Sequence, residues 1–419
     1  MPPRVLIVSW EYPPTVEGGL GRHVRKLSEG LVREGVEVHV LTRGAREHAT
    51  EEVRAGVVVH RVEEPPFPTD DLNRFVAWVD DMNTHMRAAG ARLAERIDPD
   101  LVHGHDWLVA KACAALAKRL DVPYLTTIHA TEFGRHQGWV GKHPQSYIHR
   151  TETRMAKRAD GVITCSHYMR GHVADVFGID EARVHVIPNG IDPEDLVAVG
   201  DLAALRARFA RPRDRLVLLI GRLVYEKGFQ VALDAFPQLI ERLGDVRFLV
   251  AGSGPHEQEL RKQAKKLGLM EHGTFLGWIG DDVLHSLYRI ADLCVVPSLY
   301  EPFGIVALEA MASGCPCLVA DTGGLREIVS SHDVGLRFRS RDPRSLARMV
   351  ERVLTDDDLR DRLVTEASEH VLRFDWTDVA RQTVAVYDGL ARPAEIARGP
   401  TRPPENVRGV RRSGTPSRR

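Results

Sequence analysis

The sequence lacks the features that mark membrane, secreted and nucleic-acid-binding proteins. No apolar run approaches the roughly 18–20 residues that a membrane span needs, which argues against an integral membrane protein. Only five cysteines occur in 419 residues, without CxxC spacing, which argues against a disulfide framework or a structural zinc site. The 57 Lys and Arg nearly balance the 58 Asp and Glu, and a net charge of −1 gives no global attraction for nucleic acid. We therefore expect a cytoplasmic globular protein with no stable membrane insertion and no nucleic-acid partner.

The first apolar segment, Arg4–Trp10, is short, and Pro13-Pro14 follows it without a small-residue cleavage site. This pattern predicts a first β-strand and not a signal peptide. At roughly 100–200 residues per domain, the length predicts two sizeable domains or three small ones.

The last segment, 392–419, differs in composition from the rest of the chain. It is rich in Pro, Gly and Arg, has no apolar periodicity, and carries eight Arg against two Glu, a formal charge of +6. Such a composition predicts a disordered, solvated tail. A loose tether to an acidic polymer or an anionic membrane is the alternative.

Short β-branched apolar runs alternate with amphipathic helical patterns before this tail, and the whole pattern occurs twice. The expected strands are 5–9, 36–41, 101–103, 124–128, 161–165 and 184–187, then 216–220, 246–251, 274–276, 293–296 and 317–320. The expected helices include 21–34, 229–243, 256–267 and 305–312. This alternation predicts α/β architecture, with parallel sheets covered on both faces.

Periodicity lapses near residues 193–212, where the first pattern ends and the second begins. We therefore expect two Rossmann-like, doubly wound domains, 1–195 and 196–375, that face each other across a cleft. A C-terminal helix at 376–391 would follow and could pack on either domain, the N-terminal one included.

Polar or glycine-rich residues follow nearly every expected strand. In the first half they are Glu11, Gly18, Gly19, His103, His105, Asp106, His129, Ser166 and Asn189, and in the second Gly221, Arg222, Gly252, Gly254, Gly277, Glu301, Gly323 and Gly324. Ligands of open parallel sheets bind beyond the carboxyl ends of the strands. Because both halves contribute, the pattern favours a ligand cleft between the domains.

Arg222 and Lys227 stand five residues apart on the turn that follows the strand at 216–220. A planar guanidinium fork and a mobile ammonium together suit a diphosphate. A solvated turn with one Lys–Glu pair is the alternative.

Glu301 and Glu309 flank the start of an expected helix that Gly304 opens. The amides near Phe303, Gly304 and Ile305 would form a positive helix N-terminus, which binds phosphate without a metal. Two carboxylates beside an anion site can hold hydroxyls on both sides of a diphosphate, namely a sugar and a ribose. Without this context, two such glutamates would be surface residues.

Glu301 and Glu309 resemble the E-x7-E element of the retaining family 4 glycosyltransferases, which have the two-domain GT-B fold. Arg222 and Lys227, the Gly18-Gly19 loop and the segment 188–192 (PNGID) match that family as well, and the resemblance covers about residues 4–391. It implies an N-terminal acceptor-binding domain and a C-terminal domain that binds a nucleotide sugar.

The resemblance implies that Glu301 contacts hydroxyls of the donor sugar and that Glu309 binds the ribose. Arg222 and Lys227 would neutralise the diphosphate leaving group, and the amides around Gly304 would add to them. Members of this family need no divalent metal or other cofactor, since protein cations take over that electrostatic task.

The resemblance also implies roles for backbone and facing-domain positions. The backbone near Ile279 would read the nucleotide base. Gly18 and Gly19 would approach the phosphate and the sugar, and His129 would lie beside the reacting sugar carbon.

Two segments resemble α-glucan synthases within the family. Residues 102–107 (VHGHDW) are similar to the His-Asp-Trp element of glycogen and starch synthases, and 127–135 (TIHATEFGR) to glycogen-synthase-like glucosyltransferases of actinobacterial type. His105, Asp106 and Asn189 are expected on the acceptor side; alternatively, His105 and Asp106 cap a helix. Val16 departs from the lysine of the Lys-x-Gly-Gly-Leu element of ADP-glucose glycogen synthases, which weakens the prediction of an ADP-glucose donor.

The sequence therefore predicts a retaining transferase that moves glucose from UDP- or ADP-glucose to an α-glucan or related oligosaccharide. The implied mechanism is front-face substitution. One alternative transfers mannose or N-acetylglucosamine to an inositol or lipid acceptor, and another is a nucleotide-sugar epimerase. The base, the linkage and the oligomeric state stay open.

Overall fold

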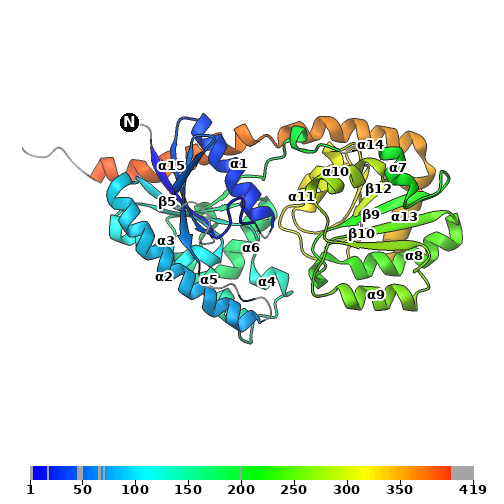
Figure 1. Cartoon of the computed structure of the whole chain (residues 1–419), viewed down its shortest axis with the longest axis horizontal. Helices are drawn as coiled ribbons and strands as arrows, with labels where there is room; N and C mark the ends of the chain where they lie inside the picture. The colour runs from blue at the N-terminus through cyan, green and yellow to red at the C-terminus, as the bar shows by residue number, and fades with distance from the viewer. Residues whose placement is uncertain are drawn as a thin grey trace, which may run out of the picture.

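The protein consists of two α/β lobes that lie side by side, each built around its own sheet (Figure 1). The computed structural model describes residues 3–16, 18–44, 51–64, 68, 71–198 and 200–397. The first lobe has an eight-stranded sheet in the order β3-β4-β2-β1-β5-β6-β7-β8, and the second a six-stranded sheet in the order β11-β10-β9-β12-β13-β14. The predicted fold, two Rossmann-like lobes followed by a C-terminal helix, is confirmed.

The first lobe contains β1 (Arg4–Val8), α1 (Gly19–Arg33), β2 (Glu37–Gly44), β3 (Glu51–Arg54), β4 (Val57–Glu63), α2 (Leu72–Ile97), β5 (Leu101–His105), α3 (Ala110–Leu120), β6 (Tyr124–Ile128), α4 (Glu132–Arg135), α5 (Gln145–Arg158), β7 (Gly161–Thr164), α6 (His167–Phe177) and β8 (Val184–Val186). The second contains α7 (Leu202–Ala207), β9 (Arg215–Ile220), α8 (Phe229–Leu243), β10 (Val246–Ala251), α9 (Glu257–Lys266), β11 (Gly273–Gly277), α10 (Asp281–Ile290), β12 (Leu293–Val296), α11 (Ile305–Ala312), β13 (Cys317–Ala320), α12 (Leu325–Ile328), β14 (Leu336–Phe338), α13 (Pro343–Thr355) and α14 (Asp357–His370).

The central strands are parallel and apolar on both faces, as the sequence predicts. In β1 the residues Val5 to Val8 are all buried, and the strand pairs in parallel with β2 and β5. Strands β3, β4 and β14 were not predicted. The sequence of β3, EEVR, has no apolar alternation because β3 is an exposed antiparallel edge strand.

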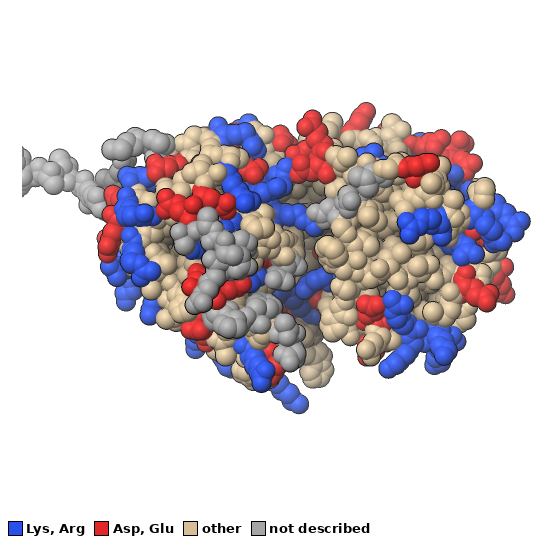
Figure 2. Space-filling model, in the orientation of Figure 1, with Lys and Arg blue, Asp and Glu red and all other residues tan. Residues whose placement is uncertain are grey.

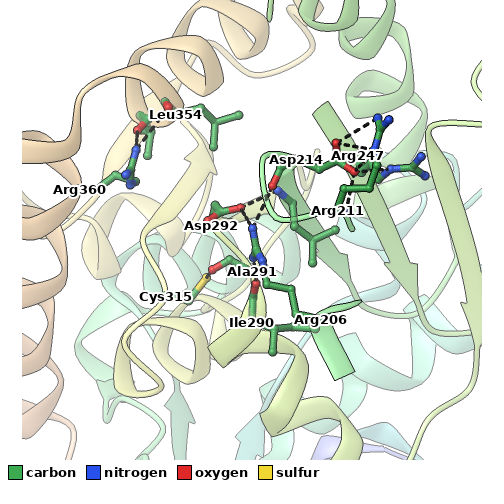
Figure 3. Close-up of polar contacts among 12 residues, drawn as sticks. Arg206, Arg211, Asp214, Arg247, Ile290, Ala291, Asp292, Cys315, Leu354 and Arg360 are labelled. Carbon is green, nitrogen blue, oxygen red and sulfur yellow. Dashed lines mark hydrogen bonds and ion pairs between the residues drawn. The ribbon is translucent and has the colours of Figure 1, made fainter. Parts of the chain in front are cut away.

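Partly buried ion pairs fasten the second lobe at the amino ends of its strands, away from the carboxyl-end face (Figure 3). Asp292 accepts hydrogen bonds from Arg206 Nη2 at 2.8 Å and from the Leu216 N–H at 2.7 Å. Asp214, which is buried, accepts from Arg247 Nε at 2.9 Å. These contacts join α7 and neighbouring strand starts, so we assign them to folding and not to catalysis.

The C-terminal helix α15 (Trp376–Ala397) packs back on the first lobe. It lies against α1, where a Cβ on Gly30 would come within 2.9 Å of the Ala380 methyl. The Tyr387 hydroxyl lies 2.8 Å from His103 Nδ1 in β5. This packing buries one face of the helix on the N-terminal sheet, one of the two surfaces expected for it.

The helix is longer than predicted, so the expected start of the tail at residue 392 is wrong. The pair Arg392-Pro393 suggested a break, but the helix continues to Ala397. Proline removes one backbone donor from a helix, while the alanines around it favour helix strongly. The remainder of the predicted disordered tail, 398–419, lies outside the described residues. The division of the lobes at 195 and 196 stays a prediction.

Every helix in the described part of the chain is too short or too polar to cross a bilayer.

Candidate active site

A cavity lies between the lobes, where the carboxyl ends of the two sheets face each other, and the space-filling surface is hollowed there (Figure 2). Its walls are formed by Gly19, Leu20, His23, His129, Ala130, Arg135, Cys165 and Asn189 of the first lobe and by Arg222, Glu226, Lys227, Tyr300, Glu301, Pro302, Phe303, Gly304 and Ile305 of the second. Nine of the predicted site residues therefore meet in one cavity: Gly19, His129, Asn189, Arg222, Lys227, Glu301, Phe303, Gly304 and Ile305. The other five, Gly18, His105, Asp106, Ile279 and Glu309, are not among its lining residues.

Lys227 and Glu301 form an ion pair on the wall of the second lobe. Lys227 Nζ lies 2.7 Å from Glu301 Oε2, and the Ser298 hydroxyl donates to the same oxygen at 3.0 Å. Glu301 is only 8% exposed, so its charge needs these partners. An ammonium has three donors, and Lys227 can therefore hold Glu301 and a bound anion together.

Backbone hydrogen bonds hold both members of this pair in place. The Leu299 N–H donates to the Glu226 carbonyl at 2.8 Å, which ties the turn Tyr225–Lys227 to the loop before Glu301. The Gly324 N–H donates to the Glu301 carbonyl at 2.9 Å. Three strand-end loops of the second lobe thus meet around Glu301.

The N-terminus of α11 opens onto the same cavity. Gly304 precedes the helix with φ of +117°, and a Cβ there would approach Leu325 to 2.6 Å, so only glycine fits. No side chain caps this helix start. The amides of a first turn have no intrahelical acceptor, and together with the helix dipole they favour a bound anion.

Glu309 lies one turn into α11, behind the cavity wall. Its Oε2 accepts a hydrogen bond from the Tyr288 hydroxyl at 2.9 Å, and Tyr288 is fully buried. This bond fixes the orientation of the carboxylate. Ile279 follows β11 and is half-buried.

Two arginines from different lobes face each other across the cavity. Arg135, on α4, was not predicted as a site residue, although its segment was noted. Burial, and next the charge of Arg135, lower the pKa of Arg222. Arg135 thus destabilises the charged form of Arg222, and an anion bound beside Arg222 would relieve this repulsion.

His129 follows β6 and is held by residues behind it. The His129 N–H donates to Asp106 Oδ1 at 2.8 Å, and His129 Nε2 lies 3.2 Å from His105 Nδ1. Burial raises the pKa of Asp106 to about 6. His105 and Asp106 thus touch His129 from beneath the cavity surface.

Four histidines lie together at the base of the first lobe's wall: His23, His103 and His105, which are buried, and His129, which is half-buried. The ring centroids of His23 and His129 are 4.6 Å apart, and those of His103 and His105 are 4.5 Å apart. Sequence reasoning missed His23. The sequence feature that could have indicated it is its position one helical turn after Gly19 on α1, because residues four apart lie on the same face of a helix.

The loop that carries Glu301 also docks on the first lobe. The Tyr300 hydroxyl accepts from the Thr131 N–H at 3.1 Å, and the Ser166 hydroxyl donates to the Pro302 carbonyl at 2.7 Å. Glu327 accepts from the His167 and Tyr168 amides at 2.9 and 2.8 Å, at the start of α6. These contacts set the distance between the two walls.

The buried histidines predict a loss of stability in mild acid. Burial lowers the pKa of His103 to about 3 and that of His129 to about 4, and lowers those of His23 and His105 well below the ordinary value. Below a pH of about 6.5 these histidines bind protons in the unfolded chain but stay neutral in the folded chain. The free energy of unfolding is therefore highest above that pH and falls toward pH 4. The carboxyls of Asp106 and Glu152 oppose this trend, because burial raises the pKa of each.

Thermal unfolding midpoints measured between pH 7.5 and 5 would check this expectation. We expect the midpoint to fall throughout the range below about pH 6.5. A midpoint that stays constant or rises on acidification would contradict the buried, neutral state of these rings.

Sequence comparisons match both lobes to glycosyltransferases. The description "Glycosyltransferase Family 4" matches residues 17–195, and "Glycosyl transferases group 1" matches residues 204–370. The chain is 39% identical over 400 residues to a protein of Mycobacterium tuberculosis named glycogen synthase, covering 92% of this chain and 94% of that one. It is 33% identical to a D-inositol 3-phosphate glycosyltransferase of Frankia alni, covering 92% and 98%.

Solved structures share the two-lobed fold. A sucrose-phosphate synthase from Thermosynechococcus elongatus superposes with a TM-score of 0.80 at 24% identity, covering 93% of this chain and all of that one. The catalytic domain of starch synthase IV from Arabidopsis thaliana, bound to ADP and acarbose, superposes with a TM-score of 0.72 at 20% identity, covering 94% and 100%.

Proposed function

Because the chain belongs to the family 4 glycosyltransferases, retaining hexosyltransferases of GT-B fold, we propose that it transfers glucose from UDP- or ADP-glucose to an α-glucan. The observation that carries this proposal is the ion pair of Lys227 with Glu301, which faces His129 across the interlobe cavity. One wall thus offers charge for a diphosphate and a carboxylate for sugar hydroxyls. The other wall offers the imidazole expected beside the reacting carbon.

In this proposal the diphosphate lies against Arg222, Lys227 and the N-terminus of α11. As the glycosidic bond breaks, negative charge grows on the leaving phosphate, and fixed cations and amides stabilise it without reorganising. Lys227 is already oriented by Glu301, so little conformational freedom is lost when it binds phosphate.

Departure of the leaving group precedes attack by the acceptor hydroxyl on the same face of the sugar. The departing phosphate oxygen accepts the proton of that hydroxyl. Glu301 holds hydroxyls of the sugar ring, and His129, fixed by His105 and Asp106, lies beside the reacting carbon. His105 and Asp106 thus act as positioning residues, which hold His129 on the acceptor side of the cavity. Asn189, the third residue expected on the acceptor side, lines the cavity itself.

The nucleoside extends beyond the enclosed cavity toward Glu309 and Ile279. Glu309 binds the ribose in the orientation that Tyr288 imposes, and the backbone near Ile279 reads the base. Val16 replaces the lysine of the ADP-glucose enzymes, so the proposal covers both UDP and ADP donors.

Gly19 provides a test of close donor approach. A Cβ built on Gly19 meets no atom within 4 Å, so the fold itself tolerates alanine there. Gly19→Ala would place a methyl group on the cavity wall. We expect unfolding midpoints equal to the wild type or slightly higher, with a donor KM raised several-fold. An unchanged KM would mean that the donor does not approach this loop.

A glucan acceptor is supported by the relative named glycogen synthase and by the two glucan-synthase-like segments. The inositol phosphate glycosyltransferase at 33% identity supports a second candidate, transfer of mannose or N-acetylglucosamine to an inositol or lipid acceptor. A panel of UDP-, ADP- and GDP-sugars crossed with maltooligosaccharides, inositol phosphates and lipid acceptors, with products identified by mass, tests both. Donor isomerised without any acceptor would instead indicate an epimerase.

We expect activity to persist in excess chelator. Arg222, Lys227 and the α11 N-terminus supply the positive charge that a divalent ion would otherwise provide. The measurement is the initial rate with and without EDTA. Loss of activity that Mg²⁺ or Mn²⁺ restores would contradict the proposed charge balance.

A further inference from the structure

Three of the four clustered histidines are close enough together to hold one metal ion. One ring nitrogen from each of His23, His105 and His129 lies within 4.8 Å of the others. His105 Nδ1 and His129 Nε2 are 3.2 Å apart. Imidazoles bound tetrahedrally to Zn²⁺ at 2.0–2.1 Å have nitrogens about 3.3 Å apart, so this pair already has the required separation.

Unsatisfied nitrogens in the same cluster point to a missing ligand. His105 Nε2 and His23 Nδ1 are buried and have no hydrogen-bond partner, and the His105 ring is completely buried. Buried polar atoms nearly always have a partner, so an orphaned nitrogen needs an explanation. An ion held by His105 Nδ1 cannot also bind Nε2 of the same ring, so the orphaned nitrogen that an ion at this position would explain is His23 Nδ1.

The donor set suits a transition-metal ion. Three neutral imidazoles with a fourth position open are a known arrangement for Zn²⁺, and imidazole also suits Cu²⁺ and Ni²⁺. His23 and His129 line the cavity, so an ion has access from the cleft, and its open position would face the donor sugar. The three residues come from α1, from β5 and from the loop after β6, so the fold assembles the cluster.

We propose that His23, His105 and His129 bind one divalent transition-metal ion such as Zn²⁺, and that the bound ion excludes the donor sugar. The site is therefore inhibitory and differs from a catalytic metal site. Exclusion of the sugar rests on the proposed function, because it depends on His129 lying beside the reacting carbon. Metal binding itself does not depend on it.

Direct titration of the full chain with Co²⁺, followed by its visible absorption, and with Zn²⁺, followed by calorimetry, tests the site. We expect one ion per chain, bound at least about 100-fold more weakly by His23→Asn, since even outer-shell changes at metal sites cost 10–100-fold. His85→Asn is the matched control, because His85 is an exposed histidine on α2. Absence of stoichiometric binding, or equal binding by both variants, would overturn the site.

X-ray absorption at the zinc edge of the wild-type protein tests the site without a variant, should His23→Asn fail to fold. A first shell with three imidazole nitrogens is expected. A shell dominated by oxygen or sulfur would overturn the assignment.

Exclusion of the sugar is tested by donor binding to ion-loaded protein freed of excess metal. We expect UDP-glucose and ADP-glucose to bind at least tenfold more weakly than to metal-free protein. Unchanged or tighter binding would overturn the inhibitory role. Failure of metal-free protein to bind any nucleotide sugar would instead contradict the proposed function. The stoichiometry of metal binding would still show whether the three histidines bind an ion.

Discussion

Replacing Arg222 or Lys227 by alanine is expected to lower kcat/KM by about 100-fold or more. Both side chains reach the cavity, where each would stabilise charge that develops on the leaving diphosphate. Loss of one preorganised donor in such a site generally has an effect of this size. Steady-state kinetics with the nucleotide sugar varied, on proteins shown to be folded, measure it.

The ion pair in the second lobe adds a further expectation for Lys227. Without its ammonium, the carboxylate of Glu301 keeps only the Ser298 hydroxyl among the partners described above. The effects of Lys227→Ala and Glu301→Gln should therefore not add, as is usual for residues in contact. Arg242→Ala is a suitable control, because Arg242 is a half-exposed cation of the same lobe that pairs with Glu351. Full activity of the Arg222→Ala, Lys227→Ala double variant would refute the diphosphate assignment.

Glu301→Gln is expected to lower kcat by about 100-fold or more, with a modest change in donor KM. Glu301 is proposed to contact the sugar, whose charge changes as the glycosidic bond breaks, and interactions that strengthen in the transition state act on kcat. Glu309→Gln should instead raise donor KM more than it lowers kcat, because the ribose does not change during the reaction.

Tyr288→Phe provides an independent test of the ribose assignment. It removes the hydrogen bond to Glu309 Oε2 without touching the donor, so a smaller increase in KM is expected. The reverse pattern, with Glu301→Gln acting on KM and Glu309→Gln on kcat, would show that the two assignments are exchanged or wrong.

The strands that carry the site were predictable because their sequences are apolar on both faces and end in polar residues. Strands β6, β10, β12 and β13 have the bounds expected from the sequence. Strand β4 was missed because Arg61 interrupts its apolar run. In the fold Arg61 is buried and pairs with Glu52 at 2.6 Å, a contact between neighbouring strands that the sequence pattern does not show.

The site residues also divide into those that the sequence pattern shows and those that depend on tertiary structure. Glu301, Lys227 and Arg222 were identified because a strand end, a glycine and a charge lie close together in the sequence. Arg135 and His23 were missed because their role depends on which helix face meets the other lobe. The pairing of Lys227 with Glu301 across 74 residues is likewise a product of tertiary structure.

The central claim is that this cavity transfers glucose to an α-glucan, and a competition assay tests it most directly. Maltopentaose and an inositol phosphate are offered together in equal amounts, with UDP-glucose or ADP-glucose as donor, and initial products are identified by mass. The account predicts maltopentaose extended by one hexose, with release of the nucleoside diphosphate, and predicts that Glu301→Gln forms both products about 100-fold or more slowly. A glycosylated inositol phosphate beside unchanged maltopentaose, or a donor isomerised with neither acceptor altered, would contradict it.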